Sequence, residues 1–162
     1  MTSRLSIFAR RFVGVAVTVM ALSPALIVTA PAAQAYTPSP TTVAAYEARV
    51  IWRMNVERAR YGRTRLAASA CPDVYAERWA AYLARSWTFY HQGLYPILRG
   101  CSAMRVAENL ARGAVSADRI VALWMASPGH RANILDGSLN RVGVAAVYAR
   151  GQWVVAANYT RV

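Results

Sequence analysis

Apolar side chains recur every three or four residues in three stretches of this chain, the spacing of a helix with one buried face. These stretches are residues 42–61, about 72–87 and roughly 116–125. Gly62 follows the first stretch as a typical stop, and Pro72 suits the first turn of the second. The pattern therefore predicts three helices, each of which packs one face on a shared core.

In the last part of the chain, apolar and polar residues alternate, which is the pattern of β-strands. Residues 141–149 and 152–160 alternate, and the tight turn at Arg150-Gly151 predicts that they are adjacent antiparallel strands. The short stretch at 108–110 is expected to start another strand of the same sheet. Helices and strands together predict an α+β domain.

The first 35 residues have the composition of an export signal. Three arginines precede an almost wholly apolar run at 12–30, and Ala33-Gln34-Ala35 is a small-x-small cleavage site. The apolar run approaches the roughly 20 residues of a spanning helix, so an uncleaved membrane anchor is the alternative. The cleavage site favours removal of residues 1–35, which leaves 36–42 as a short linker and 43–162 as one domain.

Export would bring Cys71 and Cys101 into an oxidising compartment, where they can form a disulfide. Two cysteines allow one intramolecular disulfide, which would close a loop of about 30 residues and stabilise the fold by roughly 3 to 4 kcal/mol. A reactive thiol or a metal ligand is the alternative, but the spacing is far from Cys-x-x-Cys. A structural disulfide in a secreted protein is therefore predicted.

The positive charge of the chain comes from arginine alone. All 19 basic residues are arginine, and loss of the leader removes three of them and no acidic residue. The remaining 16 arginines against seven acidic residues give a formal charge of +9. Such a surface favours anionic polymers or lipid head groups, with peripheral association to membrane or wall. Arginines scattered over solvated helix faces are the equal alternative, and export argues against nucleic acid.

The chain has only two histidines, His91 and His130, and Glu108 lies between them. Two imidazoles and a carboxylate are preferred ligands of a divalent transition metal, and His2Glu with an open position is a known zinc arrangement. The gaps of 17 and 22 residues are too long for one helix, so the fold must bring the three together. Ser127 and Pro128 can start a short helix with His130 in its first turn, where the helix dipole keeps the imidazole neutral.

Five motifs in this order resemble the bacterial branch of the CAP superfamily, also called SCP-like after the cysteine-rich secretory, antigen 5 and pathogenesis-related proteins. They are Asn55-Val56-Glu57-Arg58, Phe89-Tyr90-His91, Ala107-Glu108-Asn109-Leu110, the run from Trp124 to Leu135, and Val142-Gly143-Val144. The likeness covers roughly residues 43–162. It implies a secreted three-layer α-β-α sandwich with a central antiparallel sheet, and a surface cleft whose His/Glu tetrad can bind a divalent ion.

The resemblance implies that His91, Glu108 and His130 are the metal ligands of this cleft. Asn109 and Ser127 are expected to support it. Ser127 stands where many eukaryotic members carry a second glutamate. Since serine is a poor substitute for a carboxylate, Zn2+ is the expected cofactor, and Ca2+, which needs several oxygen ligands, is less favoured.

Two functions fit these residues. The first is an extracellular binding module that holds a lipid or an envelope component in the cleft, as family members are reported to bind sterols or fatty acids. The second is a zinc-dependent hydrolase, because an open zinc site can activate water. No separate general base is evident, and His-Glu-x-x-His, Gly-x-Ser-x-Gly and a Cys/His pair are absent from the sequence. Binding is therefore favoured, and no residue is assigned a catalytic role.

The exported protein is expected to begin at Tyr36 and to carry no free thiol. The intact mass of secreted material, with thiol labelling before and after reduction, checks both points. A retained N-terminal segment in the membrane fraction would favour the anchor instead, and a titratable thiol in the folded, non-reduced domain would argue against the disulfide.

Overall fold

The structure, a computed structural model, describes residues 38–162. The predicted leader at 1–35 lies outside this range. The first helix, α1, spans Pro40–Arg60 and starts two residues before the predicted position 42. Ser39 caps it, because its Oγ accepts a hydrogen bond from the backbone N–H of Thr42 at 3.2 Å. The end of the expected linker is therefore the first turn of α1.

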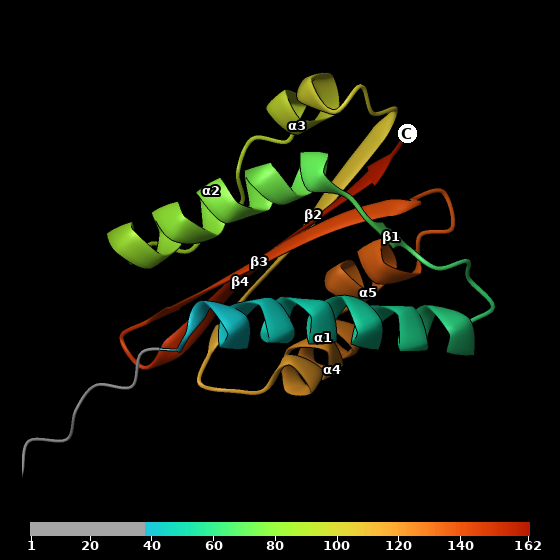
Figure 1. The fold of residues 1–162 in the computed structure, drawn as a ribbon. Helices are drawn as coiled ribbons and strands as arrows, with labels where there is room; N and C mark the ends of the chain where they lie inside the picture. The colour runs from blue at the N-terminus through green and yellow to red at the C-terminus, as the bar shows by residue number, and fades with distance from the viewer. Residues whose placement is uncertain (1–37) are drawn as a thin grey trace, which may run out of the picture. The chain divides into compact units, whose positions relative to one another are not determined.

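Eight further elements follow (Figure 1): β1 Ala67–Ala68, α2 Ala70–Ser86, α3 Tyr95–Gly100, β2 Arg105–Gly113, α4 Ala117–Ala126, α5 Pro128–Leu135, β3 Arg141–Ala149 and β4 Gln152–Arg161. The predicted helices and the terminal strand pair are confirmed to within a few residues. β2 is longer than the predicted stretch, and α3 and β1 were not predicted. Within residues 38–162, no helix combines the length and the apolar character needed to cross a membrane.

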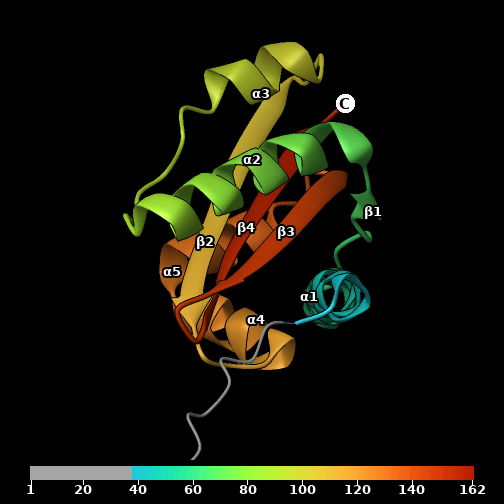
Figure 2. The same cartoon turned by 60° about the vertical axis from the view of Figure 1, so that its left-hand side comes forward.

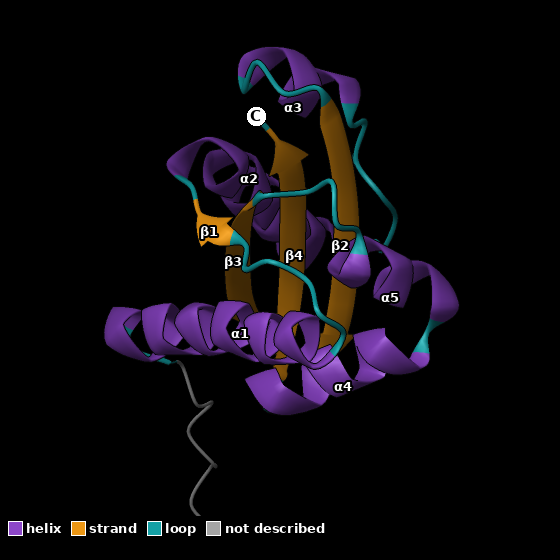
Figure 3. Ribbon diagram, turned by 90° about the vertical axis from the view of Figure 1, so that its right-hand side faces the viewer, coloured by secondary structure: helices purple, strands orange, loops and turns teal. Residues whose placement is uncertain are grey.

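The strands form one sheet in the order β1-β3-β4-β2, and Figure 3 shows the three long strands side by side. These three pair antiparallel as expected, whereas the two-residue β1 pairs parallel with β3. Arg150 and Gly151 adopt φ values of 49° and 77°, the left-handed conformation that a tight two-residue hairpin requires. The predicted hairpin is therefore confirmed, with Ala149 opposite Gln152.

Helices cover both faces of the sheet, which makes the predicted α-β-α sandwich (Figures 1 and 2). Helices α1, α4 and α5 share one core with the sheet, and α2 packs on the opposite face with α3 beside it. Alternate residues of β4 enter the two cores: Val154 and Ala156 pack with α2, and Val155 and Ala157 pack with the α1 side. β4 is therefore a strand buried on both faces.

Cys71 and Cys101 form the predicted disulfide, with their Cα atoms 5.6 Å apart. The bond joins the first turn of α2 to the residue that follows α3. Ile97 is the buried residue of α3. The disulfide therefore holds a short helix that has little apolar surface of its own in the core.

The start of α2 lies directly on β3 at Gly143. A Cβ atom at Gly143 would lie 2.1 Å from the backbone nitrogen of Asp73 and 2.5 Å from the carbonyl carbon of Pro72. Asp73 also bonds this strand, since its Oδ1 accepts from the backbone N–H of Val144 at 2.9 Å. Glycine is thus required at position 143 by the space between helix and strand.

We expect Gly143→Ala to lower the free energy of unfolding by about 2 kcal/mol or more, because the added methyl group meets helix backbone that cannot move aside. Gly129→Ala is the matched control, since no atom lies within 4 Å of its Cβ position and alanine favours a helix. Urea unfolding of both variants measures the difference. Equal stability of the two variants would contradict the close contact at Gly143.

Candidate functional site

His91 lies in the loop after α2, and its side chain is 60% exposed. Its Nδ1 lies 2.7 Å from Oε1 of Glu108, a residue of β2 whose side chain is only 1% exposed. A buried carboxylate attracts the ring N–H, so the proton resides on Nδ1. The lone pair of Nε2 is therefore available to a ligand.

Glu108 is held by a second residue, Gln92. The backbone N–H of Gln92 donates to Oε1 at 3.3 Å, and its side-chain amide donates to Oε2. The same amide donates to Oδ1 of Asn158, the cross-strand neighbour of Glu108, at 3.3 Å. Both carboxylate oxygens are thus occupied within the protein. The sequence does not indicate this role of Gln92, because its partner Glu108 lies 16 residues further along the chain.

His130 is placed by two asparagines that join α5 to β2. Asn109 donates from Nδ2 to the backbone carbonyl of His130 at 3.1 Å. Asn133, three residues after His130 on α5, donates to the carbonyl of Glu108 at 3.1 Å and to Oδ1 of Asn109 at 2.9 Å. The two amides fix the first turn of α5 against the strand that carries Glu108. Asn133 was not singled out in the sequence, because its role depends on the pairing of α5 with β2.

Burial lowers the pKa of His130, and the positive charge of a protonated His91 lowers it further. The fold therefore brings the two imidazoles close enough to interact electrostatically. The sequence predicts a neutral His130 from the helix dipole, and burial is a further cause of the lowered pKa in the structure. A neutral ring is the form that a metal ligand requires.

The three predicted ligands do not form a ready metal cage. In the part of the chain that the structure describes, no three His, Cys, Asp or Glu side chains are grouped to hold a metal. Glu108 faces His91 and Gln92, and in this position it orients a histidine, as carboxylates do behind zinc-bound imidazoles. The available donors are Nε2 of His91 and the ring of His130. Nitrogen donors suit zinc better than calcium.

Ser127 forms the corner between α4 and α5. Its backbone N–H donates to the carbonyl of Trp124 at 3.1 Å, and its carbonyl accepts from the N–H of Arg131 at 2.9 Å. Its side chain makes no capping hydrogen bond, so the expected cap by the hydroxyl is not formed. Ser127 therefore directs α5 through its backbone.

The model of the CAP family, described as the cysteine-rich secretory protein family, matches residues 52–159. The match includes both histidines, Glu108 and the whole of α2 to β3. This chain belongs to the CAP family.

Known proteins resemble this chain at low sequence identity. The uncharacterized protein YkwD of Bacillus subtilis is 29% identical over 124 residues, 72% of this chain and 48% of YkwD, so the chain spans about half the length of this curated relative. An extracellular protein containing an SCP domain from Bacillus anthracis has a TM-score of 0.65 at 23% identity, over 79% of this chain and 45% of that chain. A structure of NaASP2 with Zn2+ has a TM-score of 0.55 at 11% identity, over 70% of this chain and 78% of that chain.

Replacement of His91 by asparagine is expected to raise the pKa of His130, because it removes one of the two causes that lower it. The pKa should remain below its usual value of about 6.5, since His130 stays buried. An NMR titration of the metal-free variant measures this directly, because one histidine remains in the chain. An unchanged pKa of His130 would show that the two rings do not interact.

The lowered pKa of His130 also predicts how the stability of the domain depends on pH. Folded His130 takes up its proton at a lower pH than unfolded His130, so the domain loses stability as pH falls below about 6.5 toward the pKa of the folded state. His130→Asn is expected to remove this part of the loss. Urea unfolding of the wild type and the variant at pH 7.5 and pH 5 compares the two. An identical pH dependence in both would contradict the assignment.

Proposed function

We propose that this CAP domain is an exported binding module that takes Zn2+ at His91 and His130 and holds a lipid or another envelope component in the same cleft. The observation that carries the proposal is the contact between Nδ1 of His91 and the buried Glu108, which leaves Nε2 available near a neutral His130. The structure of NaASP2 with Zn2+ supports the choice of ion. A bound Zn2+ would offer open coordination positions to a carboxylate or phosphate oxygen of the ligand.

Three observations support export. The first 35 residues have the pattern of a cleaved leader. The disulfide between Cys71 and Cys101 suits an oxidising compartment outside the cytosol. The Bacillus anthracis protein with the same fold is extracellular. The arginine excess adds a reason for the exported domain to stay near anionic material of the envelope.

The state of Glu108 supports binding over hydrolysis. A hydrolase needs a general base within hydrogen-bond reach of the attacking water. Both oxygens of Glu108 are engaged by His91 and Gln92, so this carboxylate is not free for that role. The position where many family members carry a second glutamate is Ser127, which has no basic group of useful pKa.

Calorimetric titration with zinc tests the metal site. We expect the wild type to bind and His130→Ala to lose at least about tenfold in affinity, because one of two imidazole ligands is gone. Glu108→Gln should weaken binding by about 10- to 100-fold, the usual effect of losing the carboxylate behind a ligand histidine. Glu77→Gln removes the same charge from an exposed position on α2 and should change little. Affinity should fall as pH drops through about 6.5, because protonated imidazole cannot ligate.

Equal zinc uptake by the wild type and a folded His130→Ala would contradict the metal site, as would no uptake by the wild type at tens of micromolar. Circular dichroism shows whether the variant is folded, which matters because His130 lies in the first turn of α5. Zinc-dependent hydrolysis of an ester, a peptide or a wall fragment that is lost in His91→Ala and Glu108→Gln would place the protein among the enzymes instead.

A further inference from the structure

Arginines and aromatic rings gather at one end of the domain. This arginine–aromatic platform consists of Arg85 at the end of α2, Trp87 and Phe89 in the following loop, Arg112 on β2 and Arg150 in the β3–β4 turn. The chain turns at Trp87, whose φ of 58° is rare for a bulky residue and needs contacts to hold it. One contact is a hydrogen bond from Nη1 of Arg112 to the Trp87 carbonyl at 3.3 Å.

Two guanidinium groups of the platform, those of Arg112 and Arg150, lie over its rings, whereas Arg85 lies over the ring of Tyr82 at 6.0 Å. Cζ of Arg112 lies 4.7 Å from the ring centroid of Trp87 and 5.1 Å from that of Phe89. Cζ of Arg150 lies 4.7 Å from the ring centroid of Trp87. A guanidinium held by its face can direct its other N–H groups to the oxygens of a phosphate or carboxylate, although Nη1 of Arg112 is already bonded to the Trp87 carbonyl. The stacking also restricts the side chains in advance, which reduces the entropy lost when an anion binds.

The charge of the platform has no acidic counterpart beside it. The salt bridges within residues 38–162 do not use Arg85, Arg112 or Arg150, and all three residues are exposed. The stretches around the last two, residues 109–117 and 137–162, contain no Asp or Glu. The three arginines therefore form a local positive surface that an external anion can neutralise.

Exposed apolar rings border this positive surface. Phe89 is 45% exposed and Tyr90 is 47% exposed. Aromatic rings beside arginines suit the head-group region of a bilayer, where the rings enter the interface and the guanidinium groups meet lipid phosphates. A soluble anionic polymer would use the arginines but would gain little from an exposed phenylalanine. The composition of the platform thus favours a lipid surface.

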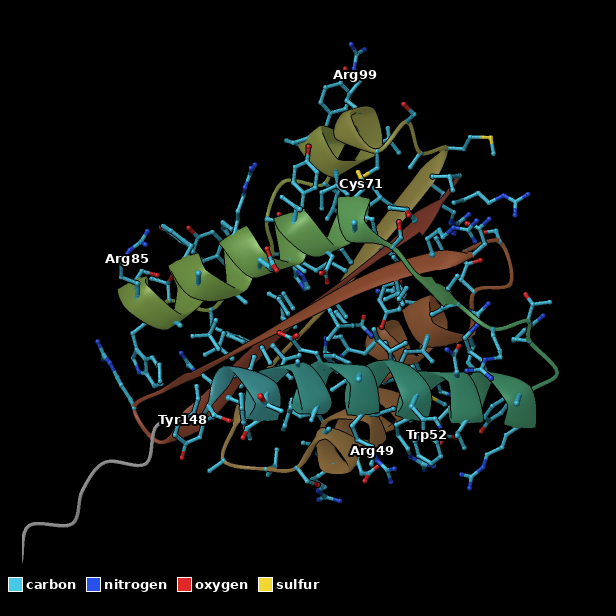
Figure 4. All side chains as sticks on the ribbon, in the orientation of Figure 1. Arg49, Trp52, Cys71, Arg85, Arg99 and Tyr148 are labelled. Carbon is cyan, nitrogen blue, oxygen red and sulfur yellow. A yellow bond between two sulfur atoms is a disulfide. The ribbon has the colours of Figure 1, made fainter. Side chains whose placement is uncertain are left out.

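The chain also enters the domain at this end. Tyr46, near the start of α1, stacks on Trp153 of β4 at 4.2 Å, close to the turn that carries Arg150. Figure 1 shows the start of α1, the β3–β4 turn and the end of α2 toward one end of the domain, and Figure 4 places Arg85 and Tyr148 there. The start of α1 is therefore on the side of the platform.

We propose that the arginine–aromatic platform docks the exported domain on a bilayer that contains anionic lipids, with its three guanidinium groups on lipid phosphates and Phe89 in the interface. This deepens the proposed function, since it rests on export, but it does not depend on zinc. His91 follows Phe89 by two residues, so docking would hold His91 next to the bilayer from which a lipid ligand comes.

Co-sedimentation of the exported protein with vesicles of phosphatidylcholine and phosphatidylglycerol in EDTA tests the platform. An arginine near an anionic leaflet strengthens binding by about fivefold, so the triple variant Arg85→Gln/Arg112→Gln/Arg150→Gln should bind on the order of a hundredfold more weakly. The wild type should not sediment with pure phosphatidylcholine. Circular dichroism of the triple variant checks that it is folded.

The matched control is Arg63→Gln/Arg65→Gln/Arg161→Gln. It removes the same charge from exposed positions just after α1 and at the end of β4, away from the platform. We expect it to lose at most several-fold in vesicle binding. Equal losses in the two triple variants would overturn the proposal, because they would show that binding depends on net charge alone.

Phe89→Ser separates a bilayer from a soluble polyanion. It should weaken vesicle binding about fivefold, because less apolar surface enters the interface, and leave binding to soluble polyphosphate unchanged. Equal vesicle binding by Phe89→Ser and the wild type would overturn bilayer docking and favour an anionic polymer as the partner. Because the vesicle assay contains EDTA, absence of zinc binding in calorimetry would end the metal proposal without affecting this one.

Discussion

The buried guanidinium of Arg58 is the interaction on which the positions of α1 and α5 depend. Arg58 is fully buried near the end of α1 and donates to four backbone carbonyls: Thr64 at 2.6 Å, Ile134 at 2.7 Å, Asp136 at 2.9 Å and Leu139 at 3.2 Å. Burial lowers its pKa, but arginine remains charged in proteins, so these carbonyls must balance the charge. The last turn of α5 is thereby held against α1, and the first turn of α5 carries His130.

The outer edge of β3 imposes a second constraint, because β1 covers only two of its residues. Beyond β1, Oδ1 of Asp73 accepts from the N–H of Val144 at 2.9 Å, and Oε1 of Glu47 accepts from the N–H of Ala146 at 2.8 Å. Burial raises the pKa of both carboxyl groups, and these hydrogen bonds partly offset that effect. Carboxylates from α1 and α2 thus occupy the donors of an edge strand that could otherwise pair with another chain. The same contacts fix both helices on the sheet.

The local sequence pattern predicted the helices and strands that depend mainly on neighbouring residues. The helical spacing gave α1, α2 and α4, and the alternation and turn chemistry gave the β3–β4 hairpin. The full length of β2 and the helix α3 were missed, because β2 is defined by its pairing with β4 and α3 is held by a disulfide. The disulfide was predicted because the protein was expected to be exported and has two cysteines, which allow only one intramolecular pairing.

The residues of the candidate site show the same division between local and long-range causes. His91, Glu108 and His130 could be named from ligand chemistry and family resemblance. The partners that position them, Gln92 and Asn133, could not, because each acts on a residue at least 16 positions away in the sequence. Their contacts are set by the packing of the loop after α2 and of α5 against β2. Sequence therefore indicates which side chains could ligate, and the fold decides which nitrogen remains available.

The loop that carries His91 explains how an exposed histidine can keep one position. Residues 87–92 have no regular secondary structure, so no ladder of backbone hydrogen bonds holds them. Side chains do so instead: Arg112 bonds the carbonyl of Trp87, Trp79 donates from Nε1 to the carbonyl of Tyr90 at 3.1 Å, and the buried carboxylate of β2 holds the ring of His91. The platform residues Trp87 and Phe89 and the candidate ligand His91 thus lie on one anchored loop. Linkage requires that any coupling between the two ends of this loop be reciprocal.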